Sequence, residues 1–214
     1  MYTGQEFDIE AGGYPFRVRV EADEFMGAPW EEHDGHGVVS GWTTRDKHPG
    51  EIVLCMDRRS RRYYDVQASM KIARRDGWGL CDEDRAALIK SLAAPGIVMR
   101  GPNRGMYRPG RAPSKPLTRG EITAEAVRRD FGYLRRWCND DWHWVGVVVE
   151  LLDGDGEVVD DRVGNISDSL WGIESEADDT LREAAQGLAE ELARGLQREA
   201  AERGYWNARD MVTV

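Results

Sequence analysis

Alternating apolar and charged residues near the N-terminus predict a β-hairpin over residues 6–21. The first half alternates Phe and Ile with acids, and the second alternates Phe and Val with arginines. Gly12 and Gly13 lie between them and supply the positive φ angles that a tight hairpin turn needs. Prolines and glycines interrupt residues 22–50, so we expect a long irregular connection there.

The middle of the chain predicts a short strand followed by two helices. Residues 51–56 form an apolar run, and Asp65 is a suitable N-cap for a helix that ends at Gly77. A second short helix is expected over residues 83–93. Residues 100–120 contain many prolines, glycines and basic residues but no acid before Glu121, which favours a mobile arm over a folded element.

The C-terminal part predicts a helix, a sheet and a second helix. Thr118 and Glu121 have the spacing of a capping box and open a helix to about residue 137. Residues 142–152, 157–163 and 170–173 read as strands, and residues 176–203 as a long amphipathic helix. The fold class is therefore α+β: an N-terminal β-hairpin with short helices, and a C-terminal antiparallel sheet packed by two longer helices.

The sequence predicts three regions along the chain. Residues 1–99 form an N-terminal α+β region, residues 100–117 a basic Pro/Gly-rich arm, and residues 118–214 a C-terminal α+β region. The alternative is that the first and last regions form one continuous domain.

Composition narrows the class of protein. A chain of 214 residues with 41% hydrophobic residues can bury a core, and no apolar run approaches the ~20 residues of a membrane span. No signal peptide is recognisable at the N-terminus. The three cysteines are odd in number and form no CxxC pair, so we expect reduced thiols, a cytoplasmic location and no membrane partner.

Charge is distributed unevenly along the chain. The net charge is −7 for residues 1–42, +9 for residues 43–119 and −11 for residues 150–203. An acidic partner would bind the basic middle of the chain, and a basic partner would bind one of the acidic ends. The alternative is that the oppositely charged segments pack against one another in the fold and neutralise one another. A further hypothesis is that the carboxylates of the C-terminal part imitate the charge of a DNA backbone and occupy a DNA-binding groove of a host protein.

The loop over residues 26–42 carries the first candidate site. Glu32, His33, Asp34 and His36 provide imidazole and carboxylate groups, the ligands that divalent transition metals accept. His48 or His143 are further candidate ligands. The dense glycines do not suit a helical metal motif, and such side chains also cap turns. We therefore expect a structural loop, with a metal site as the alternative.

The second candidate site is a basic turn that could bind nucleic acid. The third is a set of tryptophans that could bind a partner protein. Arginines beside an aromatic residue suit a nucleic-acid backbone with stacked bases, although no known nucleic-acid module is present. Tryptophan exposed on a surface is a suitable anchor for a partner protein. The nucleic-acid candidates are Arg58, Arg59, Arg61, Arg62 and Tyr63, and the partner-binding candidates are Trp30, Trp42 and Trp171.

Several segments resemble those of a family of uncharacterised proteins from tailed bacteriophages and prophages. They are GAPWEEHDGHG, RDKHPGE, RRSRRYYD, TRGEITAEAVRRDFGYLRRW, DDWHWVGVVV and SLWGIES, and they span most of the chain. The resemblance implies a phage origin and action in the cytoplasm of an infected bacterium. It identifies neither catalytic nor binding residues and implies no mechanism. His48 stands where the family pattern suggests a basic residue, which argues against a metal role for it.

These observations favour a non-enzymatic phage protein that binds and modulates or inhibits a host bacterial protein, of antiphage defence or nucleic-acid metabolism. This hypothesis requires no cofactor. One alternative is a hydrolase or nuclease that uses a divalent transition metal at His33 and His36. Another is a nucleic-acid-binding protein that uses the turn from Arg58 to Tyr64. The sequence does not define the oligomeric state.

Overall fold

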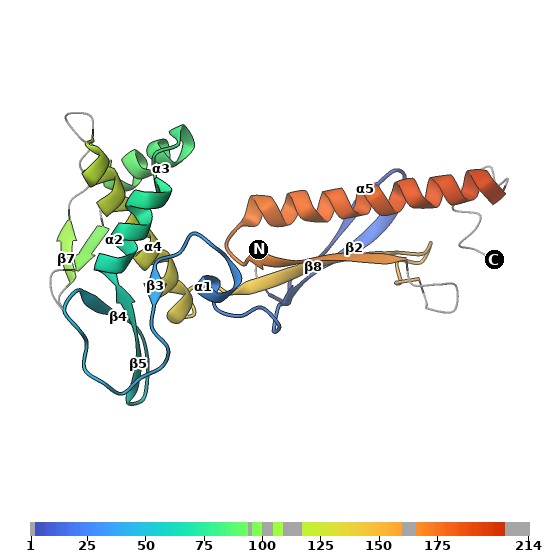
Figure 1. Ribbon diagram of the computed structural model, residues 1–214. Helices are drawn as coiled ribbons and strands as arrows, with labels where there is room; N and C mark the ends of the chain where they lie inside the picture. The colour runs from blue at the N-terminus through green and yellow to red at the C-terminus, as the bar shows by residue number, and fades with distance from the viewer. Residues whose placement is uncertain (1–2, 94–95, 100–104, 109–116, 160–165, 204–214) are drawn as a thin grey trace. The chain divides into compact units, whose positions relative to one another are not determined.

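The computed structural model describes residues 3–93, 96–99, 105–108, 117–159 and 166–203. It divides the chain into two compact units (Figure 1). Unit 1 combines residues 1–26 with residues 142–214, and unit 2 comprises residues 27–141. Unit 2 is therefore an insertion between two halves of unit 1. None of the helices that the structure describes has the length and hydrophobicity to cross a lipid bilayer.

Unit 1 is a four-stranded antiparallel sheet with one long helix. The strand order is β1-β2-β8-β9, and the helix is α5. The bounds are β1 Glu6–Ala11, β2 Tyr14–Ala22, β8 Trp144–Leu151, β9 Ser167–Glu174 and α5 Asp178–Arg203. The predicted N-terminal hairpin is confirmed, and its two turn glycines have positive φ angles of 58° and 85°.

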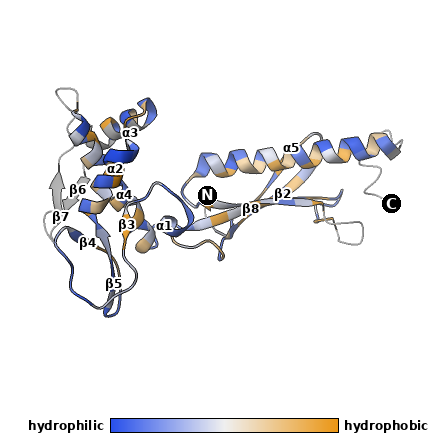
Figure 2. Ribbon diagram, in the orientation of Figure 1, coloured by the Kyte–Doolittle hydropathy of each residue, from blue (hydrophilic) through white to orange (hydrophobic). Residues whose placement is uncertain are grey.

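The core of unit 1 lies between one face of this sheet and α5. Alternate residues of β2 are buried, as expected of a strand with one covered face. In β8, every residue from Trp144 to Val147 is buried, and burial alternates only after that. The helix contributes mainly small side chains to the contact, and its hydrophobic and hydrophilic residues lie on different sides (Figure 2). The buried residues of this interface include Phe16, Val18, Val20, Val145, Val147, Val149, Leu181, Ala185, Ala189, Ala193 and Leu196. Each large one stabilises the fold by roughly 1.5–3 kcal/mol through burial.

Unit 2 packs helices on short strands. Helix α4 contacts α2, α3 and strand β4, and the core contains Leu54, Tyr64, Ala73, Val127 and Leu134. The three-stranded sheet has the order β3-β5-β4, and β6 pairs with β7. The bounds are α1 Pro29–Glu32, β3 Val38–Val39, β4 Glu51–Asp57, β5 Ser60–Asp65, α2 Val66–Asp76, α3 Asp82–Ala93, β6 Gly96–Met99, β7 Gly105–Arg108 and α4 Arg119–Cys138.

The predicted helix ends of unit 2 are confirmed. Asp65 accepts a hydrogen bond from the backbone N–H of Ala68, and Gly77 ends α2 in the left-handed conformation with φ 71°. Thr118 and Glu121 form the capping box that opens α4. These contacts satisfy backbone groups that the ends of a helix leave without partners.

Three features differ from the sequence predictions. Residues 105–108 belong to the predicted mobile arm, but they form β7, which pairs with β6. The rest of the arm from 100 to 116 lies outside the described residues.

The boundaries of the compact units lie after residue 26 and before residue 142, not at the predicted divisions at residues 99 and 118. Cys55 and Cys138 form a disulfide with Cα atoms 5.5 Å apart, so the prediction of reduced thiols is wrong for this pair. The far end of the predicted strand 157–163 is also outside the described residues.

Candidate functional site

The candidate metal loop is held by contacts within unit 2. The backbone N–H of Gly27 donates to Glu32 Oε1 at 2.9 Å, and the N–H of His33 donates to the Pro29 carbonyl at 3.0 Å. Glu32 therefore closes the turn that carries the short helix α1. His33 and Asp34 are exposed where this helix ends.

His36 contacts a buried carboxylate that the sequence analysis did not identify. Asp130 lies on α4, with a side chain only 8% exposed, and its Oδ1 is 2.7 Å from His36 Nδ1. Its Oδ2 accepts hydrogen bonds from the Gly37 N–H at 2.8 Å and from the Tyr64 hydroxyl at 2.7 Å. Burial, followed by the charge of Asp130, raises the pKa of Tyr64. One carboxylate thus binds the loop, strand β5 and helix α4 together.

The backbone approaches this cluster closely at Gly37. A Cβ atom on Gly37 would collide with the Tyr64 hydroxyl and with Ser69 Oγ. The same Ser69 Oγ accepts from the Val38 N–H at 2.9 Å and donates to the Asp65 carbonyl at 2.6 Å. The ring of His36 stacks on Tyr133 with centroids 5.5 Å apart. The glycine in this loop is therefore required by packing.

The sequence carries one signal for Asp130. It lies three residues after Val127 and four before Leu134, and both are buried apolar residues of α4. A carboxylate on the buried face of a helix needs donors, because an unpaired buried charge is costly. The position of Asp130 in the sequence therefore predicts that its carboxylate accepts hydrogen bonds, but it does not identify the donors.

The described residues contain no group of three or more His, Cys, Asp or Glu side chains arranged to hold a metal ion. His48 uses its backbone N–H to bind Glu51, and His143 belongs to unit 1, where its Nε2 is 2.6 Å from Thr3 Oγ1. A carboxylate at Nδ1 also orients catalytic histidines. Here the same carboxylate accepts from two further donors, which favours the structural role of the loop.

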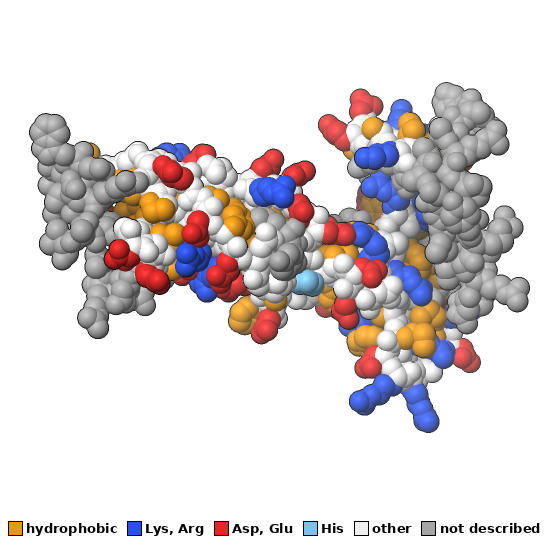
Figure 3. All heavy atoms as spheres, turned by 180° about the vertical axis from the view of Figure 1, so that it is seen from behind, with side chains coloured by type: hydrophobic (Ala, Val, Ile, Leu, Met, Phe, Trp, Pro, Cys, Tyr) orange, Lys and Arg blue, Asp and Glu red, His pale blue; other side chains and the backbone are white. Residues whose placement is uncertain are grey.

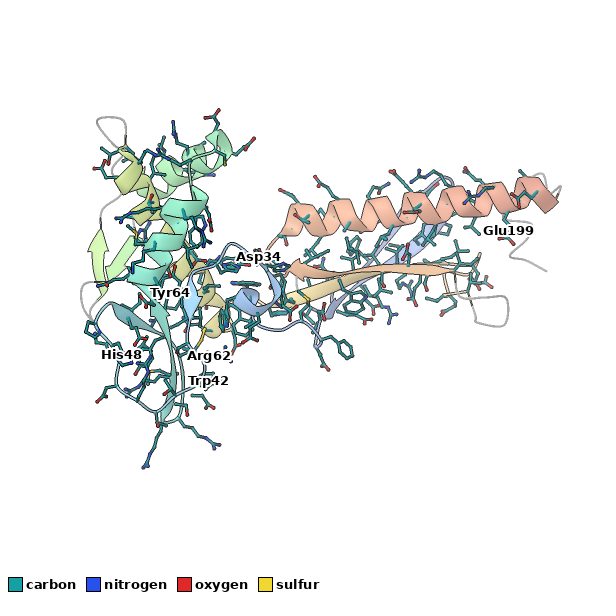
Figure 4. The ribbon with its side chains drawn as sticks, viewed as in Figure 1. Asp34, Trp42, His48, Arg62, Tyr64 and Glu199 are labelled. Carbon is teal, nitrogen blue, oxygen red and sulfur yellow. A yellow bond between two sulfur atoms is a disulfide. The ribbon has the colours of Figure 1, made fainter. Side chains whose placement is uncertain are left out.

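The second cluster lies on strand β5 and the segment beside it. Val38 and Val39 pair with the end of β5, and Thr43 exchanges two backbone hydrogen bonds with Arg61 at 3.0 and 2.8 Å. This pairing places Trp42 beside Arg62 (Figure 4). The sequence candidates for two different functions therefore meet at one site.

Arg62 lies close to two tryptophans. Its guanidinium carbon is 5.2 Å from the centroid of the Trp30 ring and 5.0 Å from that of Trp42. Its Nη1 donates to Glu31 at 3.1 Å, whereas its Nε is buried and has no hydrogen-bond partner among the described residues. Trp30 also makes an edge contact with Trp137, at 5.4 Å between ring centroids. Trp42 lies outermost and is 48% exposed.

We call this cluster the arginine–tryptophan surface. It comprises Trp30, Trp42 and Arg62, and the same β4–β5 hairpin also carries Arg58, Arg59 and Arg61. Arg58 and Arg59 are exposed at the turn between β4 and β5, where Arg58 has a positive φ of 50°. Tryptophan and arginine supply large contact area and directed hydrogen bonds, so this surface is suited to binding.

The two tyrosines of the basic turn do not belong to this surface. Tyr63 is 1% exposed, and its hydroxyl donates to the Arg45 carbonyl at 2.8 Å. Tyr64 is fully buried at the Asp130 cluster. The expectation that Tyr63 stacks on a nucleic-acid base is therefore not met in this structure. Strand alternation did not reveal this, because helix α4 covers Tyr64 and the segment that contains Arg45 contacts Tyr63.

An ion pair supports the segment between β3 and β4. Arg45 donates to both carboxylate oxygens of Glu51, at 2.7 and 2.6 Å, and the N–H of His48 donates to Glu51 at 2.6 Å. The hydrogen bond from Arg45 is the main cause that lowers the pKa of Glu51 to about 2. The Arg45 guanidinium also lies 4.8 Å from the centroid of the Tyr63 ring.

The third partner-binding candidate lies in unit 1. Trp171 on β9 is 43% exposed, and its ring covers Gly146 of β8 so closely that a Cβ there would collide with it. Its Nε1 donates to Ser169 Oγ at 3.0 Å. Trp171 is therefore not part of the arginine–tryptophan surface.

Charge separates by unit. Unit 1 has 8 Lys and Arg against 23 Asp and Glu, a formal net charge of −15, and unit 2 has 21 against 16, a charge of +5. On the face in Figure 3, acidic side chains are numerous over unit 1 and basic ones over unit 2. The two acidic ends of the chain thus belong to one unit, and neither unit neutralises its own charge.

Asp130→Ala should destabilise unit 2 by about 3 kcal/mol, because it removes the acceptor of the Gly37 N–H and leaves the Tyr64 hydroxyl with only its longer, 3.5 Å hydrogen bond to the Val127 carbonyl among the described residues. Urea denaturation measures the change. Asp34→Ala removes an exposed carboxylate of the same loop and should change stability by less than about 0.5 kcal/mol. Equal effects of the two substitutions would contradict the anchoring role of Asp130.

Glu51 should make unit 2 sensitive to acid. Its pKa is lowered in the folded state, so it stabilises the fold above its unfolded pKa of 4.5, and this contribution is lost as pH falls towards 2. Denaturation at a series of pH values should show a shallower acid-induced loss for Glu51→Gln than for the wild type. Asp57→Asn, an exposed carboxylate at the end of the same strand, should retain the wild-type acid sensitivity. An unchanged profile for Glu51→Gln would refute the assignment.

No family model matches the chain, and no curated protein or solved structure shows significant similarity to it.

Proposed function

We propose that this chain is a non-enzymatic protein that binds a partner protein through the arginine–tryptophan surface of unit 2. The observation that carries the proposal is the arrangement of Trp42, which is half exposed and rests on the guanidinium of Arg62. A large aromatic side chain fixed at a surface loses little conformational entropy on binding. Such residues are enriched among those that dominate binding energy at protein interfaces.

The layers beneath Trp42 support this role. Trp30 and Trp137 pack below Arg62, and a disulfide ties Cys138, next to Trp137, to Cys55 on β4. The surface is thus supported by α1, α4 and the β4–β5 hairpin together. Rigid support of this kind holds an anchor in its binding geometry before the partner arrives.

The charges around Trp42 indicate the chemistry of the partner. Arg58 and Arg59 are exposed at the turn of the β4–β5 hairpin that also carries Arg62, and unit 2 has a formal net charge of +5. The complementary surface is an apolar pocket with acidic groups at its rim. The resemblance to phage proteins directs the search to host bacterial proteins of defence or nucleic-acid metabolism.

Nucleic acid is the second candidate ligand, favoured by the exposed arginines Arg58 and Arg59. Trp42 would supply the stacking ring that the buried tyrosines do not. Against it, the Arg62 guanidinium lies close to two tryptophan rings and is bonded to Glu31, and its side chain is only 17% exposed, so it is poorly placed to bind phosphate. Binding to phosphates would weaken steeply with rising salt concentration.

The test compares Trp42→Ala with Trp171→Ala in the full chain. Each variant is immobilised and exposed to nuclease-treated bacterial lysate, and captured proteins are quantified by mass spectrometry. A partner should appear at a fixed molar ratio with wild type and Trp171→Ala, and fall at least about tenfold with Trp42→Ala, equivalent to ~1.4 kcal/mol.

Trp171 is a matched control, because it is also a tryptophan of similar exposure and lies in the other unit. Loss of the partner with Trp171→Ala but not Trp42→Ala would overturn the proposed surface. Capture that depends on omission of nuclease would instead support the nucleic-acid candidate.

A further inference from the structure

The outer edge of β1 is an unpaired strand edge within the described part of unit 1. Strand β1 is the first strand in the sheet order and pairs with β2 over six consecutive residues without a bulge. The other edge strand, β9, has an irregular register and a glycine at φ 76°. Bulges and twists discourage pairing at an edge, so β1 is the better template for an added strand.

The register identifies the free backbone groups of β1. The two-residue turn at Gly12 and Gly13 makes Ala11 and Tyr14 a hydrogen-bonded pair, and alternate residues of β1 then point their N–H and C=O groups towards β2. The groups of Glu6, Asp8 and Glu10 therefore point to the open edge. An extended chain beside β1 can use these donors and acceptors.

A groove follows the same edge between β1 and α5. It has a volume of about 640 Å³. On the strand side it is lined by Gln5, Phe7 and Ile9, and on the helix side by Arg182, Glu183, Ala185, Gln186, Gly187 and Glu190. Phe7 and Ile9 are only partly buried, because the small residues of α5 leave their outer sides uncovered. Side chains of an added strand that point towards the helix would enter this groove.

The opposite face of β1 is acidic. Glu6, Asp8 and Glu10 are all exposed, and Asp8 is paired with Arg17 at 3.0 Å. Among the described residues, neither Glu6 nor Glu10 takes part in an ion pair. Antiparallel pairing with β1 of a second copy would bring these carboxylates together, and like charges opposite one another destabilise a sheet. Basic side chains on the added strand would be stabilised there.

We propose that the β1 groove binds an extended segment of a partner protein in which basic and apolar residues alternate. The segment adds as a fifth strand beside β1, its apolar side chains occupy the groove, and its Lys or Arg side chains lie beside Glu6 and Glu10. Main-chain hydrogen bonds supply affinity in such strand addition, and alternate side chains supply specificity. The net charge of −15 on unit 1 attracts such a segment. This surface is separate from the arginine–tryptophan surface.

The probe is an acetylated, fluorescently labelled peptide of alternating Lys and Val, titrated with the full chain and read by fluorescence anisotropy. Two control peptides test the mode of binding. One has the same composition with all lysines before all valines, and the other carries N-methyl groups on the amides that would face β1. The alternating peptide should bind at least about tenfold more tightly than either.

Two glycines of α5 provide matched protein variants. A Cβ atom would meet no atom within 4 Å at Gly187 or at Gly195, so both sites accept a larger side chain, but only Gly187 lines the groove. Gly187→Leu should weaken binding of the alternating peptide at least about tenfold, and Gly195→Leu should leave it unchanged.

Equal binding of the two peptides of the same composition would mean non-specific charge attraction and overturn the proposal. The proposal would also be overturned if Gly187→Leu bound the alternating peptide with wild-type affinity, or if the full chain did not bind this peptide. Self-association that Gly187→Leu abolishes would identify a second copy as the occupant and contradict the proposed partner. Trp42→Ala should bind the alternating peptide like wild type, so the outcome is independent of the function proposed for unit 2.

Discussion

The antiparallel pairing of β2 with β8 is the interaction on which the rest of the structure depends. It aligns residues 16–22 with residues 145–151 and so joins the N-terminal hairpin to the C-terminal strands in one sheet. The N–H of Asp23 donates to the Trp144 carbonyl at 2.9 Å, so the ends of the inserted unit 2 leave the sheet next to each other. The entropic cost of closing a loop grows slowly with its length, and a whole compact unit can therefore be inserted there.

This pairing also explains the distribution of charge. The acidic ends of the sequence meet in unit 1, whereas the basic middle forms unit 2, so the polarity along the chain becomes a polarity between units. Each unit then presents a surface suited to a different ligand. Unit 2 offers a tryptophan on a guanidinium, on a hairpin that carries further arginines, and unit 1 offers a strand edge with a groove that has both apolar and charged lining residues.

Local structure was predictable from the sequence, whereas long-range contacts were not. The Gly12–Gly13 turn, the Asp65 cap and the Thr118 capping box depend on neighbouring residues, and all three were predicted. The site depends on residues far apart in sequence. Asp130 binds a loop more than ninety positions away, and Trp42 meets Arg62 because of the pairing of Thr43 with Arg61. Single-sequence periodicity carries no information on such pairings, which is also why Tyr63 was expected on the surface and the Cys55–Cys138 pair was missed.

Hydrogen exchange of the full chain in increasing urea, read by mass spectrometry, tests whether the two ends of the chain unfold as one sheet. Elements that open together exchange together. Peptides from β1–β2 and from β8, β9 and α5 should lose protection at the same urea concentration, despite lying at opposite ends of the sequence. Peptides from α2 and α4 should form a separate group. Loss of protection in β1–β2 together with α2, while β8 and α5 remain protected, would contradict the joined sheet.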